Sequence, residues 1–227
     1  MGKRLDRLAE MIARYLDKVE TKLETDALPE SAPSRLSLQP GDVLLVDGAG
    51  SISSLIKYLT QSTWSHAAIY VGPVLDKDTE SGEPHVLVEA NIGEGVVTAP
   101  LSKYQNCATR VCRPVGLTLR DREFVCGHVI GCLGLEYDVK NIIDLARYLL
   151  PLPVGRKWRR RTTMLGSRDP TRIICSALIA QAFQRVRFPI LASAHPRAPE
   201  IRDPSLYTPR DFDVSPYFAV VKPAFCH

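Results

Sequence analysis

Cys175 is the residue whose setting in this sequence best suits a nucleophile. An apolar lead-in, Ile173-Ile174, is followed by a breaker-free run of helix-forming residues from Ser176 to Phe183. This pattern predicts that Cys175 lies at a helix N-terminus, where the helix dipole and free N–H groups stabilise a thiolate. The same groups could hold the oxyanion formed when sulfur attacks a carbonyl. On position alone, a small buried cysteine that packs the helix is the simpler interpretation.

His66 is the histidine best placed to serve as the base. It opens a predicted strand over 66–72, beside Ala67 and Ala68, whose small side chains would let another element approach the imidazole. Histidine suits proton transfer because its ordinary pKa lies near neutrality. A hydrogen-bonded histidine at a strand end is the structural alternative. The other histidines lack a comparable setting and are interpreted as structural or solvated: His85, His128, His195 and His227.

Glu89 is the candidate for orienting the imidazole of His66. It interrupts the apolar strand predicted over 86–90, and a carboxylate in such a strand needs a partner. Strand alternation places it on the opposite face from Val86 and Val88. Nucleophile, base and orienting group together make the triad used in covalent catalysis. Further candidates for the third role are Asn91 and Glu94, and a solvent-facing Glu89 is equally compatible with the pattern.

The elements that must position these residues indicate an α+β fold. The chain has 227 residues, of which 45% are hydrophobic and 24% charged, which excludes collagen-like, low-complexity and wholly disordered classes. Strands cluster in the middle of the chain and helices follow, an arrangement typical of α+β proteins. We expect strands over 41–46, 66–72, 86–90, 96–100 and 107–114, and helices over 51–59, 122–133, 142–150 and 175–186. An amphipathic helix over 3–24 and a proline-rich linker over 25–40 precede them.

Four short segments, in this order, resemble the circularly permuted papain-like cysteine hydrolases of the NlpC-type superfamily. This is the branch with YiiX-like and YaeF-like proteins, related to the lecithin:retinol acyltransferases. The segments are 38–45, Trp64–Gly72, Val88–Ala90 and 174–179. The resemblance implies that Cys175 is the nucleophile, His66 the base and Glu89 the orienting group. It also implies a small antiparallel sheet with the cysteine helix packed across it.

The resemblance also bounds the domain and adds residues to the site. Residues 38–227 would form the hydrolase domain, and residues 1–37 an added helix and linker. Additional candidates for substrate binding or the oxyanion site are Ser176, Tyr137 and Ser65. Tyr137 matches a family position near the cleft, whereas its structural interpretation is a helix-start pair in which Asp138 is the cap.

A basic insert at about 149–170 lies outside the resemblance. Residues 140–190 hold eleven basic and two acidic residues, a local charge of +9 in a chain whose net charge is +4. The insert contains Trp158, Arg159, Arg160 and Arg161, which suits contact with an anionic membrane surface. A solvated loop is an equal alternative, and an insert that covered Cys175 would be a lid. Nucleic acid is not expected as a partner because no aromatic platform accompanies the basic run.

Cysteine usage and the N-terminus indicate a reducing compartment. The six cysteines show neither a CxxC pair nor the spacing of a zinc site, so we expect no metal and no cofactor. Residues 1–24 alternate charged and apolar residues, so no signal peptide is expected, and no stretch is long enough to span a bilayer. We therefore expect a cytoplasmic location, with peripheral membrane contact through the insert. The N-terminal helix offers a surface for oligomer formation.

The leading hypothesis is a cysteine-dependent hydrolase or acyl transferase. Its substrate would be an amide, ester or thioester, attacked by Cys175 with His66 as base to form an acyl-enzyme. A lipid or acylated molecule suits the basic insert. The alternatives are a cell-wall peptide amidase or endopeptidase, and a catalytically silent module that binds a small-molecule or peptide ligand in the same cleft.

Overall fold

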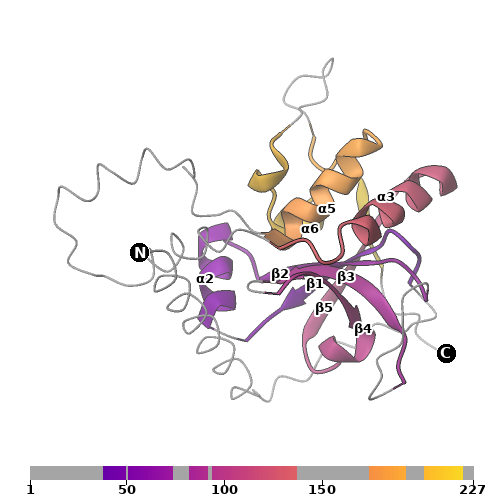
Figure 1. The fold of residues 1–227 in the computed structure, drawn as a ribbon. Helices are drawn as coiled ribbons and strands as arrows, with labels where there is room; N and C mark the ends of the chain where they lie inside the picture. The colour runs from indigo at the N-terminus through magenta and orange to yellow at the C-terminus, as the bar shows by residue number, and fades with distance from the viewer. Residues whose placement is uncertain are drawn as a thin grey trace, which may run out of the picture.

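Six antiparallel strands form the sheet at the centre of the protein (Figure 1). The structure is a computed structural model, and it describes residues 38–49, 51–73, 82–91, 94–136, 174–192 and 202–221. The strand order is β4-β3-β2-β1-β5-β6. The strands are β1 (Val43–Asp47), β2 (His66–Tyr70), β3 (His85–Asn91), β4 (Gly95–Pro100), β5 (Ala108–Pro114) and β6 (Phe218–Val221).

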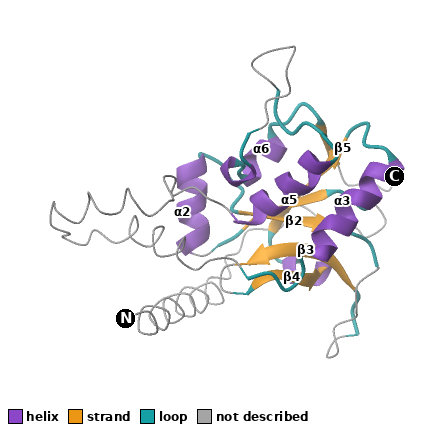
Figure 2. Ribbon diagram, turned by 45° about the horizontal axis from the view of Figure 1, so that its top comes forward, coloured by secondary structure: helices purple, strands orange, loops and turns teal. Residues whose placement is uncertain are grey.

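Helices cover one face of this sheet. They are α2 (Ser51–Thr60), α3 (Leu119–Gly131), α5 (Ile174–Arg185) and α6 (Pro209–Asp213). There are also two 3-10 turns in the described residues: η4 (Pro204–Leu206), which contacts α5, and η2 (Leu101–Tyr104), which packs on the opposite face of the sheet. α5 packs against β2, β3 and α3, and Figure 2 shows α5 and α3 together on the same side of the strands. α5 does so through one apolar stripe, whose buried members are Cys175, Leu178, Ile179, Ala182 and Phe183.

β1 is apolar from Val43 to Val46 because both faces of this stretch are buried. Val43 and Leu45 belong to the core between the sheet and the helices, whereas Leu44 and Val46 belong to a second core on the opposite face. Tyr104 of η2 lies in this second core. The continuous apolar run of β1 thus follows from its central place in the sheet.

A buried ion pair joins β5 to the start of β1. Asp42 is fully buried and accepts three hydrogen bonds from Arg113. Nε donates to Oδ1 at 2.9 Å and to Oδ2 at 3.2 Å, and Nη2 donates to Oδ2 at 2.7 Å. The backbone N–H of Gln39 also donates to Oδ2, at 2.8 Å. The pair is therefore well hydrogen-bonded, which a buried charge requires.

The expected α+β class is confirmed, and so are the five expected strands. The helices expected over 51–59, 122–133 and 175–186 are also present, with ends that differ by at most three residues. Four elements of the described chain were not expected: η2, η4, α6 and β6. β6 is a four-residue edge strand held by Phe218, whose ring lies 5.2 Å from Phe183 and 5.5 Å from Phe212.

Several expectations fall outside the described residues. These are the amphipathic helix over 3–24, nearly all of the linker, the helix over 142–150, Tyr137 and the whole basic insert with Trp158, Arg159, Arg160 and Arg161. Within the described ranges, no helix combines the length and the apolar character needed to cross a membrane.

Candidate active site

The structure brings Cys175, His66 and Glu89 together at the start of β2. Cys175 is the second residue of α5, and its side chain is hydrogen-bonded to the imidazole of His66, the first residue of β2. The backbone N–H of Ala67 also donates to the sulfur. The start of the cysteine helix therefore meets the sheet at the residue predicted to be the base.

The surroundings of Cys175 favour its thiolate. Burial alone would raise the pKa of the thiol, since only 4% of the residue is exposed. The charge of His66 and the hydrogen bond to it act in the opposite direction, assisted by Ala67 and by the hydroxyl of Ser176, and the net effect lowers the pKa. Such a lowered pKa is the property expected of a reactive cysteine.

His66 is correspondingly held in its charged form. Burial alone would lower its pKa, but the charge and hydrogen bond of Cys175, followed by those of Glu89, raise the pKa to about 10. Its Nε2 lies 3.2 Å from Oε2 of Glu89, which leaves Nδ1 as the ring nitrogen available to Cys175. The three side chains thus lie in series, and their mutual charges favour a thiolate, an imidazolium and a carboxylate.

Glu89 is fully buried, so the solvent-facing interpretation of this residue is wrong. Its Oε2 accepts from Nε2 of His66 and from the hydroxyl of Tyr104. Its Oε1 accepts from Nζ of Lys103 and, at 2.9 Å, from Nδ2 of Asn91. Burial alone would raise the pKa of the carboxyl group, but His66 and then Lys103 hold it well below its usual range. Glu89 therefore stays ionised beside the imidazole.

Lys103 and Tyr104 are residues of this site that sequence reasoning missed. They lie in η2, which follows β4 directly after Pro100. Their sequence, Leu-Ser-Lys-Tyr, carries no recognisable motif. The signal that could have found them is the need of a buried carboxylate for several donors, combined with the β3–β4 hairpin that returns the chain to Glu89.

Neither Asn91 nor Glu94 contacts the imidazole of His66, which each was considered to orient. Asn91 was a candidate for orienting the imidazole, but its side-chain amide donates to the carboxylates of Glu89 and Glu94, at 2.9 Å in each case. Glu89, and not either of these, is the residue whose carboxylate contacts His66. Asn91 therefore acts on the imidazole only through Glu89.

The two serines predicted to bind substrate or an oxyanion are both buried. The hydroxyl of Ser65 accepts from the N–H of Gly48 at 2.9 Å, which links the end of β1 to the start of β2. The hydroxyl of Ser176 lies 4.0 Å from the sulfur of Cys175. Their roles toward substrate stay predictions, as does that of Tyr137.

Metal and disulfide chemistry have no visible site in the described part of the chain. No group of three or more His, Cys, Asp or Glu residues there could hold a metal ion. No disulfide joins the cysteines that the structure describes.

The fold is similar to that of metalloprotein yiiX from Escherichia coli O157:H7, a DUF1105 protein. The two share 17% sequence identity with a TM-score of 0.51, and the match covers 82% of this chain and 97% of that chain. At this identity the likeness shows a shared YiiX-like fold. No family model and no curated protein matches the sequence.

Proposed function

We propose that this protein is a cysteine hydrolase or acyl transferase with a circularly permuted papain-like fold. The observation that carries the proposal is the series Cys175–His66–Glu89, with its thiol at the start of a helix that packs on the strand bearing its base. The order of these residues along the chain, histidine, carboxylate and then cysteine, is the permuted order. The YiiX-like fold supports the same assignment at the level of architecture.

The geometry suits a two-step acyl transfer. The Sγ thiolate of Cys175 attacks the carbonyl carbon of an amide, ester or thioester, and the carbonyl π electrons move to its oxygen. We expect free N–H groups at the start of α5 to hold that oxyanion. When the intermediate collapses, the bond to the leaving group breaks and His66 gives that group its proton. Water or another acceptor then attacks the thioester, His66 takes the acceptor's proton, and the C–S bond breaks.

The contrast with other buried cysteines argues against a purely structural role for Cys175. Burial raises the pKa of Cys112 to about 12 and that of Cys126 to about 11. Cys175 is buried as well, yet its pKa is lowered because His66 faces it. A packing cysteine needs no charged partner, whereas a nucleophile does.

An ester substrate with a chromogenic leaving group tests the proposal. Incubation with p-nitrophenyl butyrate should release nitrophenol and leave a butyryl group on Cys175, detectable by peptide mass spectrometry. Cys175→Ala should abolish both signals. Cys107→Ala is the matched control because Cys107 is more exposed than Cys175. If exposure decided reactivity, Cys107 would be acylated before Cys175. Ester turnover that survives Cys175→Ala, or a protein that binds ester without acylation, contradicts the proposal and favours the silent binding module.

Lipids or acylated molecules are the substrate class that we propose. The support comes from the sequence, where the segment of charge +9 includes the stretch that precedes Cys175. Basic residues beside tryptophan are typical of contact with anionic lipid headgroups. Peptide amides of the cell wall are the competing substrates, and they make no use of that charge.

A further inference from the structure

We propose that Lys103 and Tyr104 are positioning residues of this active site, holding the carboxylate of Glu89 in the orientation that aligns His66 with Cys175. The inference rests on the proposed function, because a positioned imidazole matters only if Cys175 reacts. It assigns a role to η2, an element that contributes no residue to the triad itself. Three observations carry it: the donor pattern on Glu89, the burial of Tyr104 and the path of the chain through η2.

Each oxygen of Glu89 accepts from two donors. Tyr104 and His66 share Oε2, while Lys103 and Asn91 share Oε1. The terminal torsion of a glutamate is broad, so a carboxylate with a single partner could rotate. With four donors in place, rotation would break several hydrogen bonds to a carboxylate that is itself fully buried. The carboxylate orientation is therefore set by its neighbours in β3 and η2 as much as by His66.

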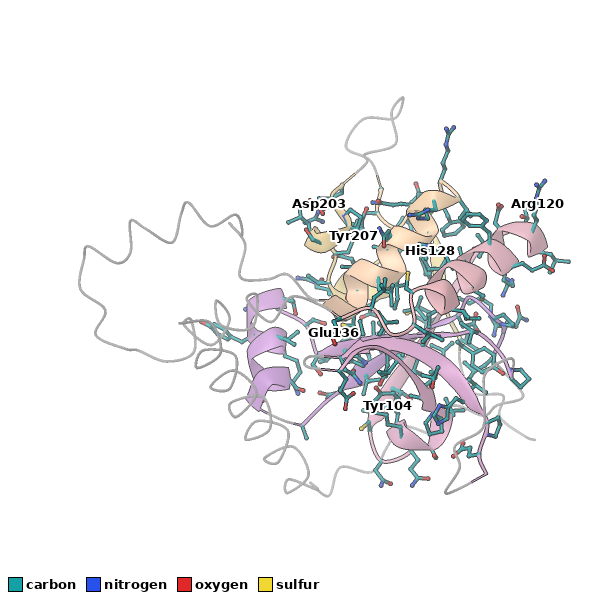
Figure 3. All side chains as sticks on the ribbon, in the orientation of Figure 1. Tyr104, Arg120, His128, Glu136, Asp203 and Tyr207 are labelled. Carbon is teal, nitrogen blue, oxygen red and sulfur yellow. The ribbon has the colours of Figure 1, made fainter. Side chains whose placement is uncertain are left out.

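Tyr104 contacts both Glu89 and His66, the two side chains that it would align. Its ring centroid lies 6.0 Å from that of His66, with the planes inclined by 38°. Only 8% of Tyr104 is exposed, and Figure 3 shows it on the side of the sheet away from α5. Burial and the carboxylate of Glu89 both raise the pKa of this phenol, so the hydroxyl keeps its proton and remains a donor.

Lys103 supplies the charge that balances Glu89. Its Nζ reaches Oε1 and also lies 5.5 Å from the centroid of the Tyr104 ring. The side chain is 42% exposed, so its ammonium keeps partial hydration while it contacts a carboxylate that has none. This arrangement reduces the cost of burying Glu89 at the active site.

The fold brings η2 to this position by a short path. Glu89 of β3 pairs with Val97 of β4, and the chain leaves β4 at Pro100 and turns at once into η2. Leu101 and Tyr104 are buried three residues apart and anchor the turn on the second core. Lys103, between them, is left at the edge with its ammonium toward Glu89.

The charges around this site determine how each substitution should act. Glu89 is faced by His66 from β2, by Asn91 from its own strand with Glu94 beyond it, and by Lys103 and Tyr104 from η2. The thiols of Cys175 in α5 and of Cys107 also lie near Tyr104. Loss of the Lys103 charge makes these surroundings more negative, which favours the protonated forms of both Cys175 and His66. Loss of the Tyr104 hydroxyl leaves the net charge unchanged and frees the carboxylate to rotate.

The rate of Cys175 alkylation by iodoacetamide, measured from about pH 4 to pH 11, tests the inference. The rate is followed by peptide mass spectrometry in the full-length protein. For Lys103→Met we expect the two ionisation steps of the profile, those of Cys175 and His66, to move to higher pH by about half a unit or more. In Lys103→Arg both steps should return to their wild-type positions. For Tyr104→Phe we expect the alkylation rate at neutral pH to be at least about threefold lower. The upper step, that of His66, should move to lower pH because the Glu89 carboxylate is no longer held in line with the imidazole.

Two control variants separate positioning from general damage to the fold. Lys57→Met removes another lysine–carboxylate pair, in which Nζ lies 2.6 Å from Oδ1 of Asp47. Tyr217→Phe removes the hydroxyl group of a half-buried tyrosine next to β6. Neither should change the profile, and circular dichroism should show all variants folded. Profiles of Lys103→Met and Tyr104→Phe that match the wild type would overturn the inference. If the wild type instead shows one ionisation near the ordinary cysteine pKa, the proposed function fails.

Discussion

Glu89 is the residue on which the alignment of His66 depends. Four donors surround a carboxylate that has no exposure, and they separate into two on each oxygen. An amide cannot replace it, because one end of an amide is itself a donor. Either orientation of a glutamine here would point its NH2 group at two other donors.

Glu89→Gln should therefore weaken both the fold and the reactive pair. We expect a loss of about 1–3 kcal/mol in the free energy of unfolding at pH 7, from unsatisfied buried groups. The pKa of His66 should fall, since a charged and hydrogen-bonded support is lost. Urea denaturation and the alkylation rate of Cys175 measure the two effects.

The stability effect of this substitution should depend on pH. The pKa of Glu89 is lowered in the folded state, so its contribution is complete above the ordinary carboxyl pKa of 4.5 and is lost as the pH falls through the folded value. The difference between wild type and Glu89→Gln should shrink below about pH 4.5. A difference that is constant down to acid pH would show that the carboxylate is not stabilised by its charge.

At the scale of elements, the contact between β4 and the segment after α3 holds one side of the site. The N–H of Val96 donates to the carbonyl of Leu135 at 3.0 Å, and the N–H of Gly134 donates to the carbonyl of Val96 at 2.9 Å. Gly95 permits this approach, since it has a φ of +78° and a Cβ there would lie 2.3 Å from the Leu135 oxygen. Gly95 also pairs with Asn91, a donor to Glu89.

Gly95→Ala should destabilise the protein, whereas Gly127→Ala should stabilise it. The first change meets both a left-handed backbone and a backbone oxygen, and we expect a loss of about 2 kcal/mol or more. The second lies in the interior of α3 with open space around it, and the better helix propensity of alanine should add about 0.5–1 kcal/mol. Thermal or urea unfolding measures both, and equal effects of the two changes would contradict the contact described at Gly95.

Most of the sheet and the proximity of Cys175, His66 and Glu89 could be predicted from sequence, whereas their catalytic roles were implied by the family resemblance and stay predictions. Apolar runs and turn residues marked the five longer strands, and Cys175 and His66 stood at the starts of well-marked elements. Lys103 and Tyr104 could not be found this way, because their role depends on strand register and on a 3-10 turn. β6 was missed because it is short and exposes Ala219 and Val220 at the sheet edge.

At the scale of the whole molecule, charge is distributed unevenly along the chain. Residues 140–190 carry +9 whereas the net charge of the protein is +4. The proposed lipid substrate predicts that this charge binds anionic vesicles, at roughly 1 kcal/mol per basic residue near the surface. Vesicles with phosphatidylserine should sediment the protein, and neutral phosphatidylcholine vesicles should not.

Charge reversal in two segments locates the contact. The triple change Arg159→Glu, Arg160→Glu and Arg161→Glu should abolish sedimentation with anionic vesicles. The matched change Lys3→Glu, Arg4→Glu and Arg7→Glu alters the net charge equally and should leave it intact, because acids and bases alternate in that segment. Binding that survives the first change, or no binding by the wild type, removes the support for a lipid substrate.

The protonation of His66 tests the central claim, the charged pair between Cys175 and His66, most directly. An NMR titration of the histidine side chains should show His66 charged up to about pH 10 in the wild type. In Cys175→Ser the thiolate is absent, so the midpoint should fall by more than about one unit. His128, whose pKa burial lowers, is an internal reference that should titrate alike in both proteins. A His66 midpoint that is the same in both proteins would contradict the pair.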